Sequence, residues 1–149
     1  MSFELDLKKF AEKAAARADE AVEGIIVGLH VKIDARSPVG DAKYWKSPPP
    51  KGYVGGRFRA NWQLGVGSMP GGTIATPDPD GGSVRARIQA GIPSDASGKV
   101  YFLANNVPYA QRIEHGWSTQ APQGVVGLSM MEVQDVVDSA VSKARAVHP

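Results

Sequence analysis

Three histidines are the residues of this chain best suited to metal binding or proton transfer, and their spacing argues against both roles. None of His30, His115 and His148 has a second histidine about one helical turn away, as a helical metal site requires. His115 follows Glu114, but no nucleophile motif accompanies that pair. The chain has no cysteine, which excludes thiol catalysis, Cys-based zinc sites and disulfides. The sequence therefore predicts no metal ion and no cofactor.

The glycine-rich and acidic stretches also lack a catalytic pattern. The glycines of residues 65–67 and 71–72 are not followed by the Lys-Ser/Thr pair of a phosphate-binding loop. Asp78 and Asp80 lie in a Pro-Asp-Pro-Asp-Gly-Gly run that is typical of turns. No glutamate follows them at the spacing of a helix-loop-helix calcium site. We predict that the protein is not an enzyme.

Four arginines are the best candidates for a charged binding surface. Arg57 and Arg59 alternate along one predicted strand, and Arg85 and Arg87 alternate along another. If the two strands pair, the four guanidinium groups could line one face of the sheet and contact an acidic partner or DNA phosphates. A charged strand face that is only solvated is the alternative. The net charge of +2 is too small to indicate a general nucleic-acid-binding protein.

A long N-terminal helix is the first element expected to position these residues. Apolar or small side chains recur every three or four positions from Leu7 to Ile33. Ser2 is expected to cap the start of this helix. Gly24 and Gly28, one turn apart, indicate either a locally weak helix or the close approach of a neighbouring element.

Residues 40–56 are rich in proline, glycine and aromatic side chains, and three consecutive prolines rule out regular structure across most of them. Tyr44, Trp45 and Tyr53 lie in this segment. A loop of this length is unusual in a compact domain and is often functional. We expect an ordered extension whose aromatic rings dock on a partner. The alternative is that the rings cover the core of their own domain.

The remaining sequence predicts about four short strands. Alternating apolar and polar residues predict strands at residues 57–66 and 83–92. Residues 99–103 are a third candidate strand, and residues 124–128 are a candidate edge strand. The first two are expected to form an antiparallel pair joined by a long loop.

Two further helices complete the prediction. Residues 108–114 are predicted to form a short helix that starts at a proline. Ser129 and Glu132 have the spacing of a capping box for a C-terminal helix. The fold class is therefore α+β, with a small antiparallel sheet of about four strands packed by the long N-terminal helix and the C-terminal helix. We expect the 149 residues to form a single domain, with residues 40–56 as an inserted loop.

No apolar run approaches the roughly 18 residues of a membrane-spanning helix, and the first residues are acidic and polar rather than typical of a signal peptide. We therefore expect the protein to fold in the cytoplasm and to have no membrane partner.

Three stretches of the sequence together resemble one family. The first consists of residues 36–39 (RSPV) and 56–62 (GRFRANW), the second is residues 106–116 (NVPYAQRIEHG), and the third is residues 120–126 (QAPQGVV) before the final helix. In their order and spacing they resemble the HK97 gp10-like family of phage tail-completion and head–tail joining (neck) proteins. The resemblance extends over nearly the whole chain.

The resemblance implies a structural virion protein of a tailed bacteriophage, assembled in the host cytoplasm and located in the neck or tail. Its implied partners are copies of itself in a ring, expected to be a hexamer, together with the connector or stopper proteins and the tail tube protein. DNA would pass through the lumen only transiently. A stopper, an adaptor or another minor tail protein is the nearest alternative function, and a nucleic-acid-binding module is a more distant one.

One departure from the family concerns the inserted loop. Family members usually continue from Pro-Val-Asp-Thr-Gly directly into the arginine-bearing strand, whereas here residues 40–56 intervene. We expect the long helix and this loop to provide the contacts with partners. Glu114 is one candidate partner for Arg57 or Arg59, either within a subunit or across a ring interface. Trp62 is expected in the core, and Trp117 is expected at an interface. The candidate interface residues are Tyr44, Trp45, Tyr53, Arg57, Arg59, Tyr109, Glu114 and Trp117.

Overall fold

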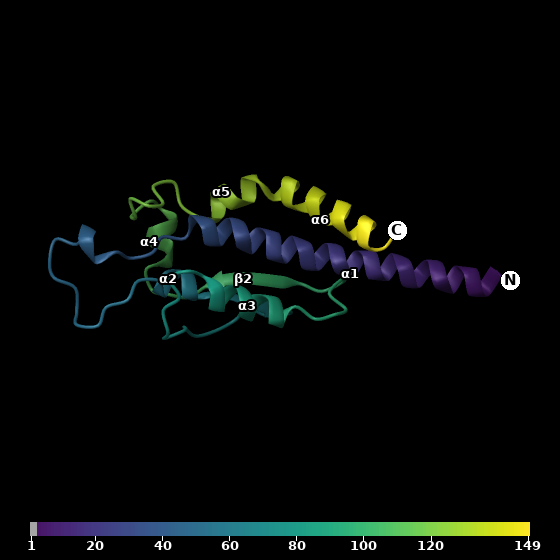
Figure 1. The fold of residues 1–149 in the computed structure, drawn as a ribbon, viewed down its shortest axis with the longest axis horizontal. Helices are drawn as coiled ribbons and strands as arrows, with labels where there is room; N and C mark the ends of the chain where they lie inside the picture. Colours follow the sequence, from purple (N-terminus) through teal and green to yellow (C-terminus); the bar gives the residue numbers. More distant parts are fainter. Residues whose placement is uncertain (1–2) are drawn as a thin grey trace.

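The computed structural model describes residues 3–149, without the side chains of Phe3 and Leu5. The expected N-cap residue, Ser2, lies outside the described residues. The fold is arranged around one long helix, α1 (Phe3–Arg36), as predicted. The helices α5 (Val126–Met131) and α6 (Val133–Val147) lie along one side of α1, and a two-stranded sheet with helix α3 (Gly82–Gly91) lies along the other (Figure 1).

The first turns of α1 extend past the rest of the molecule. The 34 residues of α1 span roughly 50 Å at 1.5 Å per residue. Helix α6 runs antiparallel to α1, and its end is fixed where the Arg17 side chain donates a hydrogen bond to the His148 carbonyl. The part of α1 before Arg17 therefore projects beyond the C-terminus of α6 (Figure 1).

The two helical glycines of α1 mark the closest approach of α6, which decides between the two interpretations of these glycines. A Cβ atom on Gly24 would lie 3.0 Å from the Ala140 Cβ, and one on Gly28 would lie 2.7 Å from the Val136 Cγ1. The glycines thus allow the two helices to pack closely along a line where only small residues fit.

We predict that Gly28→Ala will lower the free energy of unfolding by about 1 kcal/mol, although alanine favours helix by a similar amount. The new methyl group would overlap the short, stiff side chain of Val136. Chemical denaturation measures the effect. If the two substitutions acted independently, their losses in free energy of unfolding would add. The double variant Gly28→Ala/Val136→Ala should lose less than that sum. A purely additive result would contradict the overlap.

The sheet has two strands among the described residues, rather than the expected four. Strands β1 (Trp62–Val66) and β2 (Tyr101–Asn105) pair antiparallel, with Trp62 opposite Asn105 and Val66 opposite Tyr101. Strand β1 is the second half of the strand predicted at 57–66, and β2 lies two residues further along the chain than the strand predicted at 99–103. The α+β class is confirmed, and the number of strands was wrong.

The predicted strand at residues 83–92 is the helix α3. Val84 and Ile88 are almost fully buried, and their spacing of four residues fits a helix as well as it fits a strand. The carboxylate of Asp78 decides between them, because it accepts hydrogen bonds from the backbone N–H groups of Gly81 (3.1 Å) and Val84 (2.7 Å). These bonds satisfy donors that a helix leaves free in its first turn.

The strand predicted at 57–66 was wrong in its first half, and the strand predicted at 124–128 was wrong throughout. Residues Arg57–Ala60 form the short helix α2, and the segment predicted as a strand at 124–128 begins α5. The side chain of Asn61, which is fully buried, helps to close the α2 turn by donating to the Arg57 carbonyl (2.7 Å). Helix α4 (Ala110–Glu114) confirms the short helix predicted at 108–114.

The capping box predicted at Ser129 and Glu132 is not formed. Ser129 is buried within α5, and its hydroxyl donates to the Val125 carbonyl (2.7 Å). Glu132 forms ion pairs with Lys32 and Arg36 of α1 instead. Contacts with α1 therefore replace the predicted local cap. The predicted C-terminal helix is divided into α5 and α6.

The core lies between α1, the sheet and α3. Trp62 is 4% exposed, which confirms its predicted place in the core. Ile113 is buried and Tyr109 packs against the core, as expected for their spacing. The buried core residues are Ile26, Ile33, Phe58, Trp62, Val84, Ile88, Val107, Ile113, Ala121 and Val125. Within residues 3–149, no helix is both long enough and apolar enough to cross a membrane.

His30 is a buried histidine of α1, and its Nε2 atom has no hydrogen-bond partner among the described residues. Burial lowers the pKa of His30 below its usual value. Asp34 opposes this change, while Arg85 and Arg87 add to it. Because the unfolded chain then binds the proton more tightly, the His30 contribution to stability is complete above about pH 6.5 and is lost as the pH falls below it.

We therefore predict that the free energy of unfolding will fall as the pH drops below about 6.5, with a slope of at most about 1.4 kcal/mol per pH unit from His30. Urea titrations at several pH values measure the slope. The variant His30→Gln should reduce it. An unchanged slope in that variant would show that other groups cause the loss of stability.

Candidate interaction surface

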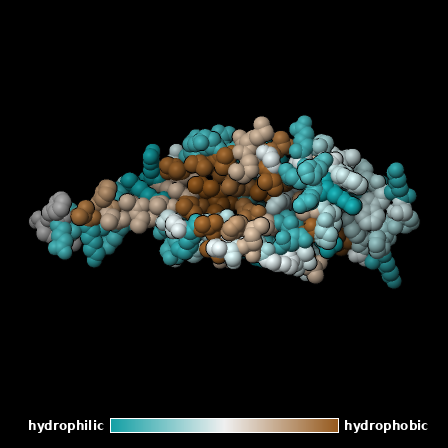
Figure 2. All heavy atoms as spheres, turned by 180° about the vertical axis from the view of Figure 1, so that it is seen from behind, coloured by the Kyte–Doolittle hydropathy of each residue, from teal (hydrophilic) through white to brown (hydrophobic). Residues whose placement is uncertain are grey.

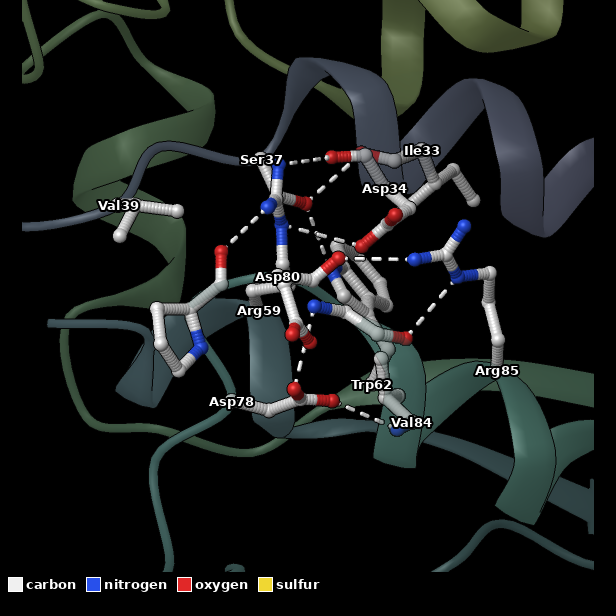
Figure 3. Close-up of polar contacts among 12 residues, drawn as sticks. Ile33, Asp34, Ser37, Val39, Arg59, Trp62, Asp78, Asp80, Val84 and Arg85 are labelled. Atoms are coloured by element: carbon white, nitrogen blue, oxygen red, sulfur yellow. Dashed lines mark hydrogen bonds and ion pairs between the residues drawn. The ribbon is translucent and has the colours of Figure 1, made fainter.

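A buried ion pair fixes the polypeptide that follows the inserted loop. The Arg59 Nε and Asp34 Oδ1 atoms are 3.1 Å apart, and their side chains are 17% and 12% exposed. Arg59 also donates to the carbonyl oxygens of Pro79 (2.6 Å) and Asp34 (3.1 Å). Figure 3 shows these contacts between α1, α2 and the segment that precedes α3. Arg59, a candidate interface residue, is therefore used inside the chain.

A second set of contacts ties the end of α1 to the start of the sheet. The Trp62 indole N–H donates to the Ser37 hydroxyl (2.9 Å), which in turn donates to the Ile33 carbonyl (2.7 Å) (Figure 3). The Ser37 hydroxyl thus satisfies a carbonyl that the end of a helix leaves free. Together with the ion pair, these bonds hold the segments that precede and follow the inserted loop against one another.

The inserted loop leaves the body and returns to it at nearly the same point. A Cβ atom on Gly55 would overlap the Gly40 carbonyl oxygen, so glycine is needed where the two arms meet. Between them, no residue from 41 to 54 is buried. The loop contains one short 3-10 helix, η1 (Ala42–Tyr44), and projects from the end of the molecule opposite the N-terminus (Figure 1).

The three aromatic residues of the loop are exposed and lie outside the buried core, although Trp45 and Tyr53 line a cleft together with the core residues Phe58 and Ile113. Tyr44 is 73% exposed, Trp45 is 41% exposed and Tyr53 is 36% exposed. The rings of Trp45 and Tyr53 contact each other, with centroids 4.6 Å apart. This contact gives the loop local order while more than a third of the surface of each of the three residues stays open to solvent.

Four of the eight candidate residues meet at a cleft at the base of the loop. Trp45, Tyr53, Arg57 and Tyr109 line a cleft of about 430 Å³. The Arg57 guanidinium carbon lies 5.7 Å from the centroid of the Tyr109 ring, a cation–π distance. Burial raises the pKa of Tyr109, while the charge of Arg57 opposes that change. The cleft combines exposed rings with one cation, and it contains no nucleophile–base pair.

Within the chain, Glu114 pairs with neither Arg57 nor Arg59, which corrects the ion pair expected within a subunit. Its carboxylate accepts hydrogen bonds from the backbone N–H groups of Val125 (3.0 Å), Val126 (2.8 Å) and Gly127 (2.9 Å). Burial raises the pKa of Glu114, but these three donors lower it more, and the net pKa is below the usual value. Glu114 therefore holds the start of α5 and joins the second motif stretch to the third.

We predict that Glu114→Ala will lower the free energy of unfolding by about 1–2 kcal/mol, after allowance for partial solvent exposure. Three backbone donors would lose their charged acceptor. Glu114→Gln should cost less, because one acceptor oxygen remains. In the wild type, the pKa of Glu114 is lowered on folding. The stability that its carboxylate contributes is therefore lost only when the pH falls below the ordinary pKa of glutamate. Equal stabilities of the two variants would contradict this role.

The remaining candidate residues, Tyr44 and Trp117, lie outside the cleft. Trp117 is 73% exposed, and Arg112 lies 5.0 Å from its ring centroid. The Tyr44 ring is within 4.9 Å of the Lys43 ammonium group. Both rings thus carry an adjacent positive charge and large open surfaces.

Gln120 contributes a contact that the sequence interpretation missed. Its side-chain amide bonds both backbone groups of Val39, accepting from the N–H (3.0 Å) and donating to the carbonyl (2.8 Å). This pairing holds the loop 118–124 against the segment that precedes the inserted loop. Position 120 lies inside the third motif stretch, which is the only sequence signal that could have indicated it.

The expected face of four arginines does not exist. Arg85 donates to the carbonyls of Gly81 and Asp80, and Arg87 donates to the carbonyls of Ala60 and Trp62. The reason is that residues 83–92 form a helix rather than a strand. Arg59, Arg85 and Arg87 therefore donate to backbone carbonyl groups of their own chain, whereas Arg57 lies against the Tyr109 ring.

No group of three or more His, Asp or Glu side chains is arranged to hold a metal ion in the part of the chain that the structure describes. Comparisons with models of known protein families, with curated proteins and with solved structures find no match to this chain.

Proposed function

We propose that the protein is a non-enzymatic structural subunit of a tailed bacteriophage that completes the tail and joins it to the head. The observation that carries this proposal is the inserted loop, which presents Tyr44, Trp45 and Tyr53 to solvent from one end of the molecule. Exposed aromatic rings over a firmly held base are suited to binding another protein. The sequence resemblance supplies the kind of partner.

The arrangement of the motif stretches supports the same proposal. The stretches that resemble the neck proteins contact one another around the base of the loop, through Arg57 with Tyr109, Gln120 with Val39, and Glu114 with the start of α5. Segments far apart in the sequence are therefore in contact at the base of the loop, and we call this set of segments the platform. In this proposal, the platform holds the loop in a fixed direction so that its rings reach a neighbouring protein of the neck.

The proposed mechanism is assembly without chemistry. Copies of the subunit would form a ring, expected to be a hexamer, through contacts in which one surface meets a different surface of the next copy. The loop end would contact the connector or stopper proteins or the tail tube protein. DNA would pass through the lumen only transiently, because Arg59, Arg85 and Arg87 donate to carbonyl groups of their own chain and do not form the face of four arginines expected from the sequence.

Electron microscopy of particles from a phage that carries a nonsense mutation in this gene tests the proposal. We expect DNA-filled heads beside separate, unattached tails, and we expect expression of the wild-type gene to restore joined particles. Heads that have lost their DNA would instead assign the protein to the stopper position. Normal, infectious, fully tailed particles would refute a role in the neck.

A further inference from the structure

An open apolar groove runs along the middle of α1. Its floor is one face of α1, one wall is β2, and the other wall is α5, with a volume of about 390 Å³. Figure 2 shows the groove region as a continuous hydrophobic patch on the face opposite to the view of Figure 1. The lining residues are Val22, Ile25, Ile26, Leu29, Ile33, Tyr101, Leu103, Val126 and Met130. A patch with this composition normally marks a contact surface.

The projecting part of α1 carries a second apolar surface that no other element covers. Leu7 is 54% exposed and Phe10 is 69% exposed, and the small residues Ala11, Ala14 and Ala18 of the same stripe are also exposed. Their spacing of three and four residues places them along one side of the helix. In a single copy, this stripe lies in water beyond the end of α6 (Figure 1).

The stripe and the groove floor lie on the same face of the same helix. Leu7 and Ile25 are eighteen residues apart, as are Ala11 and Leu29, and eighteen residues make five complete turns. The two surfaces therefore point in one direction and differ only in their position along α1. Phe10 is likewise five turns before Gly28, so it points toward the α6 side of the groove.

We propose that two copies of the chain pair through α1 in an antiparallel dimer whose twofold axis passes near Ala18. In this arrangement Leu7 faces Leu29 of the second copy, Ala11 faces Ile25, and Ala14 faces Val22. Small alanines thus meet the large side chains of the groove. Each projecting helix fills the groove of the other copy, and one symmetry operation covers all four apolar surfaces.

A second copy suits this groove better than other occupants for two reasons. The helix that the groove needs is present on the chain itself, with apolar positions at the spacing that groove-binding helices use. The projecting part of α1 also stands clear of α6, so the two bodies would lie end to end without overlap (Figure 1). The dimer describes the free protein and does not depend on the proposed ring.

Light scattering coupled to size-exclusion chromatography of the full chain tests the dimer. We expect the wild type to have the mass of two chains. The variant Ala18→Glu, at an exposed position, should raise the dissociation constant at least about 100-fold, because it brings like charges together at the axis. Lys13→Glu is the control, since position 13 lies about 140° around α1 from Ala18, and it should leave the dimer intact although it changes the charge by two units.

Cross-linking gives a second, geometric test, since the chain has no cysteine. Oxidation of Ala18→Cys should give a covalent dimer in high yield, whereas Lys13→Cys should not, because a disulfide needs Cα atoms within about 7 Å. A wild-type monomer at tens of micromolar would overturn the proposal. Equal cross-linking of the two cysteine variants, or an oligomer unaffected by Ala18→Glu, would overturn it as well.

Hydrogen exchange separates the proposed helix from a strand of another protein as the occupant. The Gly67 N–H donates to the Val100 carbonyl (2.8 Å). Hydrogen-bonded and non-hydrogen-bonded residue pairs alternate along an antiparallel pair of strands, so the N–H groups of Tyr101 and Leu103 point away from β1. A third strand would bond to these groups and slow their exchange. The helix of a second copy should leave their exchange nearly unchanged, and strong protection on assembly would overturn the dimer proposal.

Discussion

Replacing Asp34 with alanine is expected to lower the free energy of unfolding by about 3–5 kcal/mol, the largest loss of stability that we predict for an ionic residue of this chain. The reason is that Arg59 would keep its charge in a buried position without its partner. Removing one member of a buried pair costs far more than the pair itself contributes, because the remaining charge has lost both water and its counterion. Urea denaturation followed by circular dichroism measures the loss.

Two controls separate the buried charge from other effects of the substitution. The double variant Asp34→Ala/Arg59→Met removes both charges and should recover a large part of the lost stability. Glu12→Ala removes a partner of the exposed pair with Lys8, and it should change the free energy of unfolding by less than about 1 kcal/mol. A double variant as unstable as Asp34→Ala alone would show that the carboxylate has another role.

Under the proposed function, deleting residues 41–54, so that Gly40 is joined to Gly55, is expected to reduce the yield of infectious, joined particles at least about 100-fold, the scale expected when several aromatic contacts are lost. The two glycines already touch, and none of the deleted residues is buried. The body should therefore fold with a change in stability of less than about 1 kcal/mol, which includes the small entropic gain from a shorter loop. Complementation of a nonsense mutant phage measures the yield.

A matched variant distinguishes the aromatic rings from the length of the loop. Changing Tyr44, Trp45 and Tyr53 together to alanine keeps every backbone atom, and it should lower the yield nearly as much as the deletion. A triple variant that joins heads to tails normally would show that the rings are not the contact. A deletion variant that fails to fold would show that the loop supports the body, and the triple variant would then carry the test alone.

The sequence was informative where local patterns and local contacts agree. The periodic apolar residues of α1 and α6 predicted both helices, and the proline triplet predicted an irregular loop. Trp62 was expected in the core because of its size, and it is 4% exposed. For the candidate site, the motif stretches and the aromatic residues pointed to a shared surface, and Trp45, Tyr53, Arg57 and Tyr109 do meet at one cleft.

The sequence was misleading where one short pattern fits two structures. Val84 and Ile88 satisfy both a helical and a strand period, and only the Asp78 carboxylate at the first turn of α3 favours the helix. The capping box failed for a similar reason. Glu132 can serve its own helix or the cations of α1, and the ion pairs with Lys32 and Arg36 decide that competition.

The sequence by itself determined the long helix, the terminal helix, the position of the exposed loop and the lack of recognisable catalytic motifs. These features follow from residue types and spacing within one segment, where the physics is local. Only the tertiary structure decided that Arg59 is buried against Asp34, that Glu114 holds the start of α5, and that the loop begins and ends at one point. Such pairings depend on which distant segments meet. A charged side chain has several partners of similar energy, and packing of the whole chain selects one of them.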